Sequence, residues 1–214
     1  MPARPPGQRC HTVRMAAHDH AGPGHGPESA AGHEHTGGHQ HGAADPACAM
    51  AHGDLEPAPD GRTLVAVFAS PVGRSLLHFA RDAGFRTVLV EPEPGRVTDA
   101  DRALAGTVLT GPAAEVLGAD ADVVVTDHDR PELGELLRDA LAAGPRWVGV
   151  MGSPRHTAPH LAALAALGVP PDEVAKVHRP IGLNIGSRTP PEIALSTLAG
   201  LIADRNGRPG GFTF

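Results

Sequence analysis

The hydrophobic pattern of this chain changes sharply near Thr63. From Thr63 onward, short continuous runs of Val, Leu, Ile and Ala alternate with longer segments that carry an apolar residue every three or four positions. Continuous apolar runs are typical of strands buried on both faces of a parallel sheet, and the wider spacing is typical of amphipathic helices. The alternation therefore predicts an α/β fold, a doubly wound parallel sheet with helices on both faces.

The expected elements follow one another in regular order. The strands are expected at residues 64–68, 86–90, 107–109, 123–126 and 147–151. The helices and helical turns are expected at residues 72–83, 97–104, 113–117, 131–143, 154–167 and 190–205. Ser153 and Thr189 are expected to cap two of these helices, because a hydroxyl accepts hydrogen bonds from first-turn N–H groups. The pattern thus predicts one domain over residues 62–206 and a short C-terminal tail over residues 207–214.

Residues 1–61 have a different composition, dominated by His, Gly, Ala and Pro, with almost no Val, Ile, Leu or Phe. Such a segment cannot bury enough apolar surface to offset its ordering entropy, so we expect a disordered tail. Nine of the 14 histidines lie between His11 and His52, several of them in His-x-His pairs. Imidazole binds Zn²⁺, Ni²⁺ and Cu²⁺ well. The expected metal ligands of the tail are His18, His20, His33, His35, His39, His41, Cys48 and His52.

Charge and cysteine content exclude several classes of protein. The net charge of -6 argues against non-specific nucleic-acid binding. No apolar run is long enough to span a membrane, and the N-terminus has no apolar signal core. The only cysteines, Cys10 and Cys48, lie outside the expected core. We therefore expect a cytoplasmic protein without disulfides and without nucleic-acid or membrane partners.

The residues of the turn after the first strand indicate whether this Rossmann-like sheet can bind a dinucleotide. Such sites need the pattern G-x-G-x-x-G, whose glycines let the backbone approach a pyrophosphate. Here the corresponding residues 68–73 keep only the last glycine, Gly73, while Phe68 and Ser70 carry side chains where the close approach is needed. Glu91 is near the position that usually binds the ribose. Because Pro92 follows it, a structural turn is an equally good interpretation of this residue. We therefore do not expect NAD to bind.

Residues 179–196 carry the strongest local signal of the chain. Thr189 is followed by Pro190 and, three positions on, by Glu192, which is the spacing of a capping box with proline in the first turn. The free N–H groups expected in that turn, and the glycines before it, favour an anion site. An ordinary well-capped helix is the alternative interpretation.

This segment resembles the C-terminal signature of the XdhC/CoxI family, the accessory proteins of molybdenum hydroxylases. The family pattern reads roughly P-I-G-L-D-I-G-x-x-T-P-x-E-I-A-x-S-I, and Asn184 stands where the family usually has Asp. Residues 147–156 resemble a second family pattern, Y-I-G-x-x-G-S-R-R-K/T, in which Arg155 keeps a basic residue and Pro154 replaces another. Residues 123–128 are a weaker third match. The resemblance covers about residues 62–206.

The resemblance implies a non-catalytic protein that binds molybdenum cofactor and assists its delivery to an apoenzyme similar to xanthine dehydrogenase or carbon monoxide dehydrogenase. The implied partners are that molybdenum hydroxylase, a cysteine desulfurase and a second copy of the chain in a homodimer. The phosphate and polar pterin of the cofactor suit a glycine-rich pocket at the carboxyl ends of the strands. The residues expected to bind it are Gly152, Ser153, Arg155, Gly182, Asn184, Gly186, Arg188 and Thr189.

Two other functions stay open at this point. The family's usual N-terminal domain, with its Cys-Gly-Gly-type element, is replaced in this sequence by the His-rich tail. A protein that binds or senses Ni, Zn or Cu through the tail, with the α/β domain as its scaffold, is therefore the main alternative. A nucleotide-dependent oxidoreductase is the third, disfavoured by the missing glycines at residues 68–73. Whether the chain is an enzyme is left undecided, with the non-catalytic accessory protein favoured.

Overall fold

The computed structural model describes residues 46–56, 61–153 and 157–211. The chain forms two compact units that meet in sequence at Asp54 and Leu55. The described part of the first unit contains a short helix, α1 (Pro46–Ala51), none of whose residues is buried. The sequence pattern did not predict this helix, in which a proline in the first turn is followed by Ala, Cys and Met, residues that suit a helix. The disordered tail stays a prediction. The six predicted histidine ligands from His18 to His41 lie outside the described residues.

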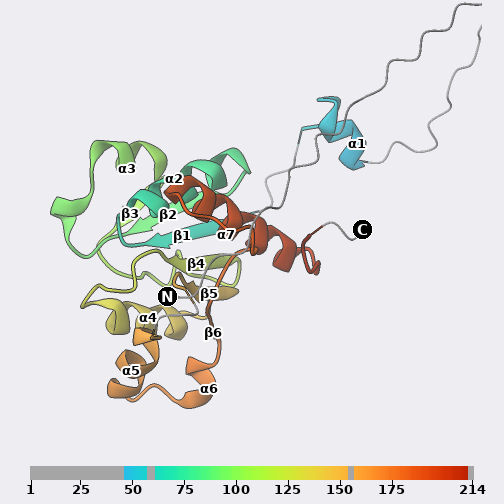
Figure 1. Ribbon diagram of the computed structural model, residues 1–214. Helices are drawn as coiled ribbons and strands as arrows, with labels where there is room; N and C mark the ends of the chain where they lie inside the picture. Colours follow the sequence, from blue (N-terminus) through green and yellow to red (C-terminus); the bar gives the residue numbers. More distant parts are fainter. Residues whose placement is uncertain (1–45, 57–60, 154–156, 212–214) are drawn as a thin grey trace, which may run out of the picture. The chain divides into compact units, whose positions relative to one another are not determined.

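The second unit is built on a six-stranded sheet in which every pairing is parallel. Its strands are β1 (Thr63–Val67), β2 (Arg86–Val90), β3 (Thr107–Leu109), β4 (Ala121–Val125), β5 (Trp147–Val150) and β6 (Val177–His178). Their spatial order is β3-β2-β1-β4-β5-β6 (Figure 1). This order confirms the predicted Rossmann-like fold and puts the point where the order reverses between β1 and β4. The two residues of β6 were not predicted, since a strand so short has no readable hydrophobic pattern.

Helices cover both faces of this sheet (Figure 1). They are α2 (Pro71–Asp82), α3 (Asp99–Leu104), α4 (Leu133–Ala142), α5 (Pro159–Ala166), α6 (Pro171–Val174) and α7 (Pro190–Arg205), with one 3-10 turn at Pro94–Arg96. The helices α2 and α7 pack on one face, and α4 and α5 pack on the other. Within the described ranges, none of the helices has the length and apolar character needed to cross a membrane.

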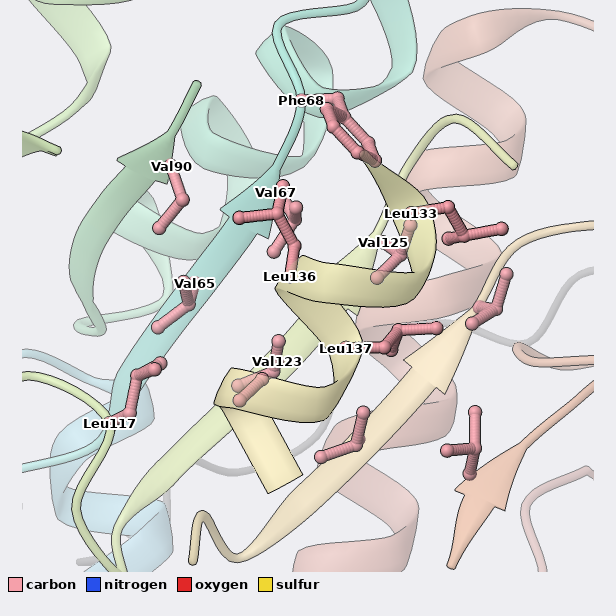
Figure 2. Close-up of a cluster of buried hydrophobic side chains, with 14 of the residues drawn as sticks. Val65, Val67, Phe68, Val90, Leu117, Val123, Val125, Leu133, Leu136 and Leu137 are labelled. Atoms are coloured by element: carbon pink, nitrogen blue, oxygen red, sulfur yellow. The ribbon is translucent and has the colours of Figure 1, made fainter. Parts of the chain in front are cut away.

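Two hydrophobic clusters, one on each face, explain why the strands read as continuous apolar runs. In β1, Leu64 and Ala66 join the cluster under α2 and α7, whereas Val65 and Val67 join the cluster under α4. Figure 2 shows the second cluster, in which the β1 and β4 valines lie beside the leucines of α4. Because alternate residues of each strand are buried on opposite sides, the strands are mostly apolar, and the buried polar residues Thr87 and Asp122 lie near the starts of β2 and β4.

The helix after β5 begins later than the sequence pattern predicts. It starts at Pro159, and Ala158 occupies the cap position without a side-chain hydrogen bond. Ser153 therefore does not cap this helix, and that prediction is wrong. The proline at the first helical position explains the true start, because the residue before a proline is held out of the helical region. Residues 154–156, which include the predicted ligand Arg155, lie outside the described residues.

Candidate functional site

The turn after β1 is filled by an aromatic side chain where a dinucleotide site has its first glycine. Phe68 has a left-handed backbone with φ of 74°, a conformation that costs a bulky residue energy and that glycine adopts freely. Its side chain is fully buried, and the guanidinium carbon of Arg130 lies 4.6 Å from the centre of its ring. The ring and the guanidinium thus close the carboxyl end of β1.

Glu91, at the end of β2, is committed to an internal ion pair. Its carboxylate accepts two hydrogen bonds from Arg130, at 3.0 and 3.2 Å, and others from the N–H groups of Ala69 and Glu93 at 2.9 and 3.0 Å. Burial alone would raise the pKa of Glu91, but the hydrogen bonds from Arg130 and the two N–H groups outweigh it and lower that pKa. The position expected for ribose recognition therefore has its acceptors occupied. The prediction that NAD does not bind stays a prediction, and these contacts are its physical basis.

Two hydroxyls join the loops after β1 and β4. Ser70 caps α2 by accepting from the Gly73 N–H at 2.9 Å, and its hydroxyl donates to Thr126 at 2.9 Å. Thr126 lies within hydrogen-bonding distance of the Phe68 carbonyl, at 3.0 Å. A Cβ on Gly73 would lie 3.2 Å from that same carbonyl, so this glycine allows helix and strand to pack closely. The strand-order reversal is thus closed by contacts within the chain.

The turn after β5 meets the residue that follows β6. A Cβ on Gly152 would lie 2.6 Å from Nη2 of Arg179, so the guanidinium lies directly on the glycine. The same Nη2 donates to the Ser153 carbonyl at 3.2 Å. The structure therefore brings Gly152 and Ser153 together with an arginine that was not among the predicted site residues. The sequence offered one sign of this role, since Arg179 is the first residue of the 179–196 segment. That Arg179 follows a strand could not be predicted, because β6 was not predicted.

Gly182 lies against the middle of α7. Its φ is 86°, and a Cβ there would lie 2.7 Å from Ser196 Oγ and 3.0 Å from the Thr197 nitrogen. The loop is fixed on the helix by the Leu183 N–H, which donates to the Ser196 carbonyl at 3.1 Å. Close backbone packing therefore accounts for this glycine, whether or not it also borders a ligand.

The other predicted residues of this loop are exposed. Asn184, Gly186 and Arg188 all lie at the surface. Gly186 has a φ of 70°, and a Cβ at that position would meet no atom within 4 Å. The amide of Asn184 and the guanidinium of Arg188 are thus exposed to solvent, and the space beside Gly186 is open to solvent.

The start of α7 does not offer the free N–H groups that the sequence predicts, so that part of the prediction is wrong. Pro190 and Pro191 have no N–H, and the N–H of Glu192 donates to Thr189 Oγ1 at 3.4 Å. The Glu192 carboxylate accepts from the N–H groups of Arg188 and Thr189 at 2.7 and 3.1 Å. These backbone hydrogen bonds lower the pKa of Glu192. A carboxylate of the chain itself therefore occupies the place proposed for an external anion.

The remaining polar candidates belong to two segments of the chain, the loop after β4 and the helix α1 with the residue after it. After β4, Asp127 accepts from the Asp129 N–H at 3.0 Å, and His128 lies 3.7 Å from Asp129 with 30% of its side chain exposed. Cys48 is exposed and lies on α1, and His52 follows that helix. Within residues 46–56, 61–153 and 157–211, no group of three or more His, Cys, Asp or Glu side chains is placed to hold a metal ion.

Comparison with known proteins places this domain in a family. The sequence model described as the XdhC Rossmann domain matches residues 64–201, which include both the 147–156 and the 179–196 segments. YqeB, an uncharacterized protein of Escherichia coli, is 35% identical over 105 residues, which cover 47% of this chain and 19% of YqeB. A crystal structure described as a xanthine dehydrogenase from Bacillus halodurans has a TM-score of 0.56 and 25% identity, over 69% of this chain and 45% of that one. The chain thus spans less than half the length of either relative.

Proposed function

Because this chain belongs to the XdhC Rossmann-domain family, we propose that it is an accessory protein of a molybdenum hydroxylase. In this proposal it binds molybdenum cofactor and assists its delivery to an enzyme of the xanthine dehydrogenase or carbon monoxide dehydrogenase type. The match over residues 64–201 carries the proposal. The description of the Bacillus halodurans relative as a xanthine dehydrogenase supports the same class of target. A cysteine desulfurase and a second copy of the chain are further proposed partners.

The geometry favours side-chain donors over helix N-termini as the groups that hold the cofactor phosphate. The described helix after β5 begins only at Pro159, and the first turn of α7 has no free N–H group at Thr189. Guanidinium groups form strong charge-assisted hydrogen bonds with phosphate, and Arg188 is exposed on the loop before α7. The amide of Asn184 is exposed on the same loop as Arg188 and can serve the polar pterin.

The test is retention and transfer of the cofactor by the full-length protein. Wild-type protein is loaded anaerobically with molybdenum cofactor, separated from free cofactor and mixed with a molybdenum hydroxylase apoenzyme. We expect bound cofactor after separation and recovery of hydroxylase activity. A wild-type protein that retains no cofactor and restores no activity would contradict the proposal.

Two arginine variants make the test specific. Replacing Arg188 with Gln removes one charge-assisted hydrogen bond to phosphate, so the affinity for the cofactor should fall about tenfold or more. Arg102 is also exposed, but it lies on α3 and not on the 179–189 segment, so Arg102→Gln is the matched control. Equal retention by both variants would remove Arg188 from the proposed site.

A further inference from the structure

A cavity of about 370 Å³ is lined by residues from the start of α5, the helix α6 and the end of β6. These three elements lie at the β6 edge of the sheet (Figure 1). The side chains that matter for its chemistry are His160, Leu161, Val174, Val177 and Arg179. Its volume lies within the range of sites for small organic ligands. The proposed function does not use this cavity.

Two side chains of this lining each carry a buried nitrogen atom without a hydrogen-bond partner among the described residues. His160 is only 3% exposed, and its Nδ1 has no hydrogen-bond partner among the described residues. The Nε of Arg179 is also buried without such a partner in the described part of the chain, although Nη2 of the same guanidinium contacts Ser153. A buried polar atom without a partner is costly, and native proteins satisfy nearly all of them. The Nε of Arg179 lies against Gly152, so the unpaired nitrogen that a ligand of this cavity could satisfy is Nδ1 of His160.

The electrostatics of the cavity favour a negatively charged ligand. Arg179 brings a permanent positive charge, and α5 begins here with its positive dipole end, at Pro159. Burial, and then the charge of Arg179, lower the pKa of His160. The side chains that line the cavity include no carboxylate from the described residues. An anion would therefore meet a cation and an imidazole without repulsion from an acidic group of the lining.

The rest of the cavity wall is apolar. Leu161 of α5, Val174 of α6 and Val177 of β6 line it opposite or beside the two polar side chains. A free inorganic ion would leave this surface uncovered, whereas an organic body would bury it and gain roughly 25 cal/mol for each Å² removed from water. The wall thus selects for an anion that carries an apolar group.

We infer that the cavity between α5, α6 and β6 is a binding site for a small organic anion, whose carboxylate or phosphate contacts Arg179 and His160 and whose apolar body packs on Leu161, Val174 and Val177. The inference rests on the cavity and on the unpaired Nδ1 of His160, and it goes beyond the accessory function proposed above.

Calorimetric titration of the full-length protein with benzoate, phenyl phosphate and benzyl alcohol tests the site. We expect at least one of the two anions to bind at millimolar concentration or more tightly, and benzyl alcohol to bind at least about tenfold more weakly than that anion. The anion that binds more tightly distinguishes a carboxylate from a phosphate ligand, and either result supports the site. Absence of binding by both anions, or equal binding of benzyl alcohol, would overturn it.

Variants assign the binding to these residues. Arg179→Gln and His160→Gln should each weaken anion binding about tenfold or more, whereas Arg102→Gln, at an exposed arginine of α3, should leave it unchanged. Arg179→Lys keeps the charge and should retain part of the affinity, so it serves if Arg179→Gln does not fold. Equal anion affinity in the wild type and in folded Arg179 and His160 variants would overturn the inference.

Discussion

The two regions at the carboxyl edge of this sheet, the β1–β4 reversal and the β5–β6 end, use their polar groups in opposite ways. At the reversal, Glu91 and Arg130 satisfy each other, and Ser70 and Thr126 do the same. At the β5–β6 end, Arg179 keeps a buried nitrogen without a hydrogen-bond partner among the described residues. Ligands of open α/β sheets usually bind at the strand-order reversal. In this chain the polar side chains at the reversal bond to one another, so the fold offers a position for a site without supplying free polar groups there.

The β1–β4 reversal, called the closed region below, also contains a strained backbone. Phe68 holds a left-handed backbone and is the one residue other than glycine with positive φ in the described part of the chain. Its buried ring and the Arg130 guanidinium beside it compensate that cost. The closed region is thus built for stability, and changes there should affect unfolding more than binding.

The largest effect is expected from opening the closed region. Glu91→Ala leaves the Arg130 guanidinium, whose side chain is 6% exposed, without its buried carboxylate. Breaking a buried ion pair from one side should lower the free energy of unfolding by about 3–5 kcal/mol. Urea unfolding followed by circular dichroism measures it. Glu132 supplies the other carboxylate on the same guanidinium, and its side chain is 32% exposed. Glu132→Ala should therefore lower the free energy of unfolding much less than Glu91→Ala does. Similar losses in both variants would contradict the central place of the Glu91 pair.

A smaller effect separates two glycines of the loop between β6 and α7. Ala at Gly182 meets both a positive φ and a contact of 2.7 Å with Ser196, so we expect a loss of about 2–4 kcal/mol in the free energy of unfolding. Ala at Gly186 meets only the positive φ, so the expected loss is about 1 kcal/mol. Thermal and urea unfolding of both variants measure the difference. If Gly182→Ala is no worse than Gly186→Ala, the loop does not pack on α7 as described.

The smallest effect is the pH dependence contributed by His160. Burial, followed by the charge of Arg179, lowers the pKa of this histidine, so the unfolded chain binds its proton more readily than the folded protein does. The free energy of unfolding should therefore fall as the pH decreases through the ordinary histidine value of about 6.5 toward the lowered pKa. His160→Gln should lose this share of the slope. Its effect at alkaline pH, where His160 is neutral in both states, gives the packing contribution alone. Parallel pH profiles for the wild type and the variant would show that His160 titrates equally in both states.

The hydrophobic pattern was sufficient to predict most of the fold. Five of the six strands were expected from runs such as the one at β1, because residues buried on both faces must all be apolar. The short elements α6 and β6 were missed because four and two residues are too few for a periodic signal, and α1 and the 3-10 turn at Pro94–Arg96 were not predicted either. The start of α5 was misplaced because Pro154 and Pro159 both satisfy the first turn of a helix, and only the folded backbone distinguishes them.

The candidate site was less predictable than the fold. The capping box at Thr189 was confirmed, but the free N–H groups expected beside it were not found. Pro190 and Pro191 have no N–H, and Glu192 accepts the hydrogen bond of the Arg188 N–H. Arg179 and His160 were missed, since their meeting depends on β6 and on the start of α5. Binding of metal by the His-rich tail and the cytoplasmic location stay predictions.

The sequence by itself determined the family, the alternation of strands and helices and the loss of the glycines at Phe68 and Ser70. These properties are local, because they depend only on residue types and their spacing along the chain. Only the tertiary structure decided that Arg130 closes the ends of β1 and β2, and that His160 and Arg179 border one cavity. Each of these contacts joins residues from separate elements. Their meeting depends on strand order and helix packing, which no local pattern encodes.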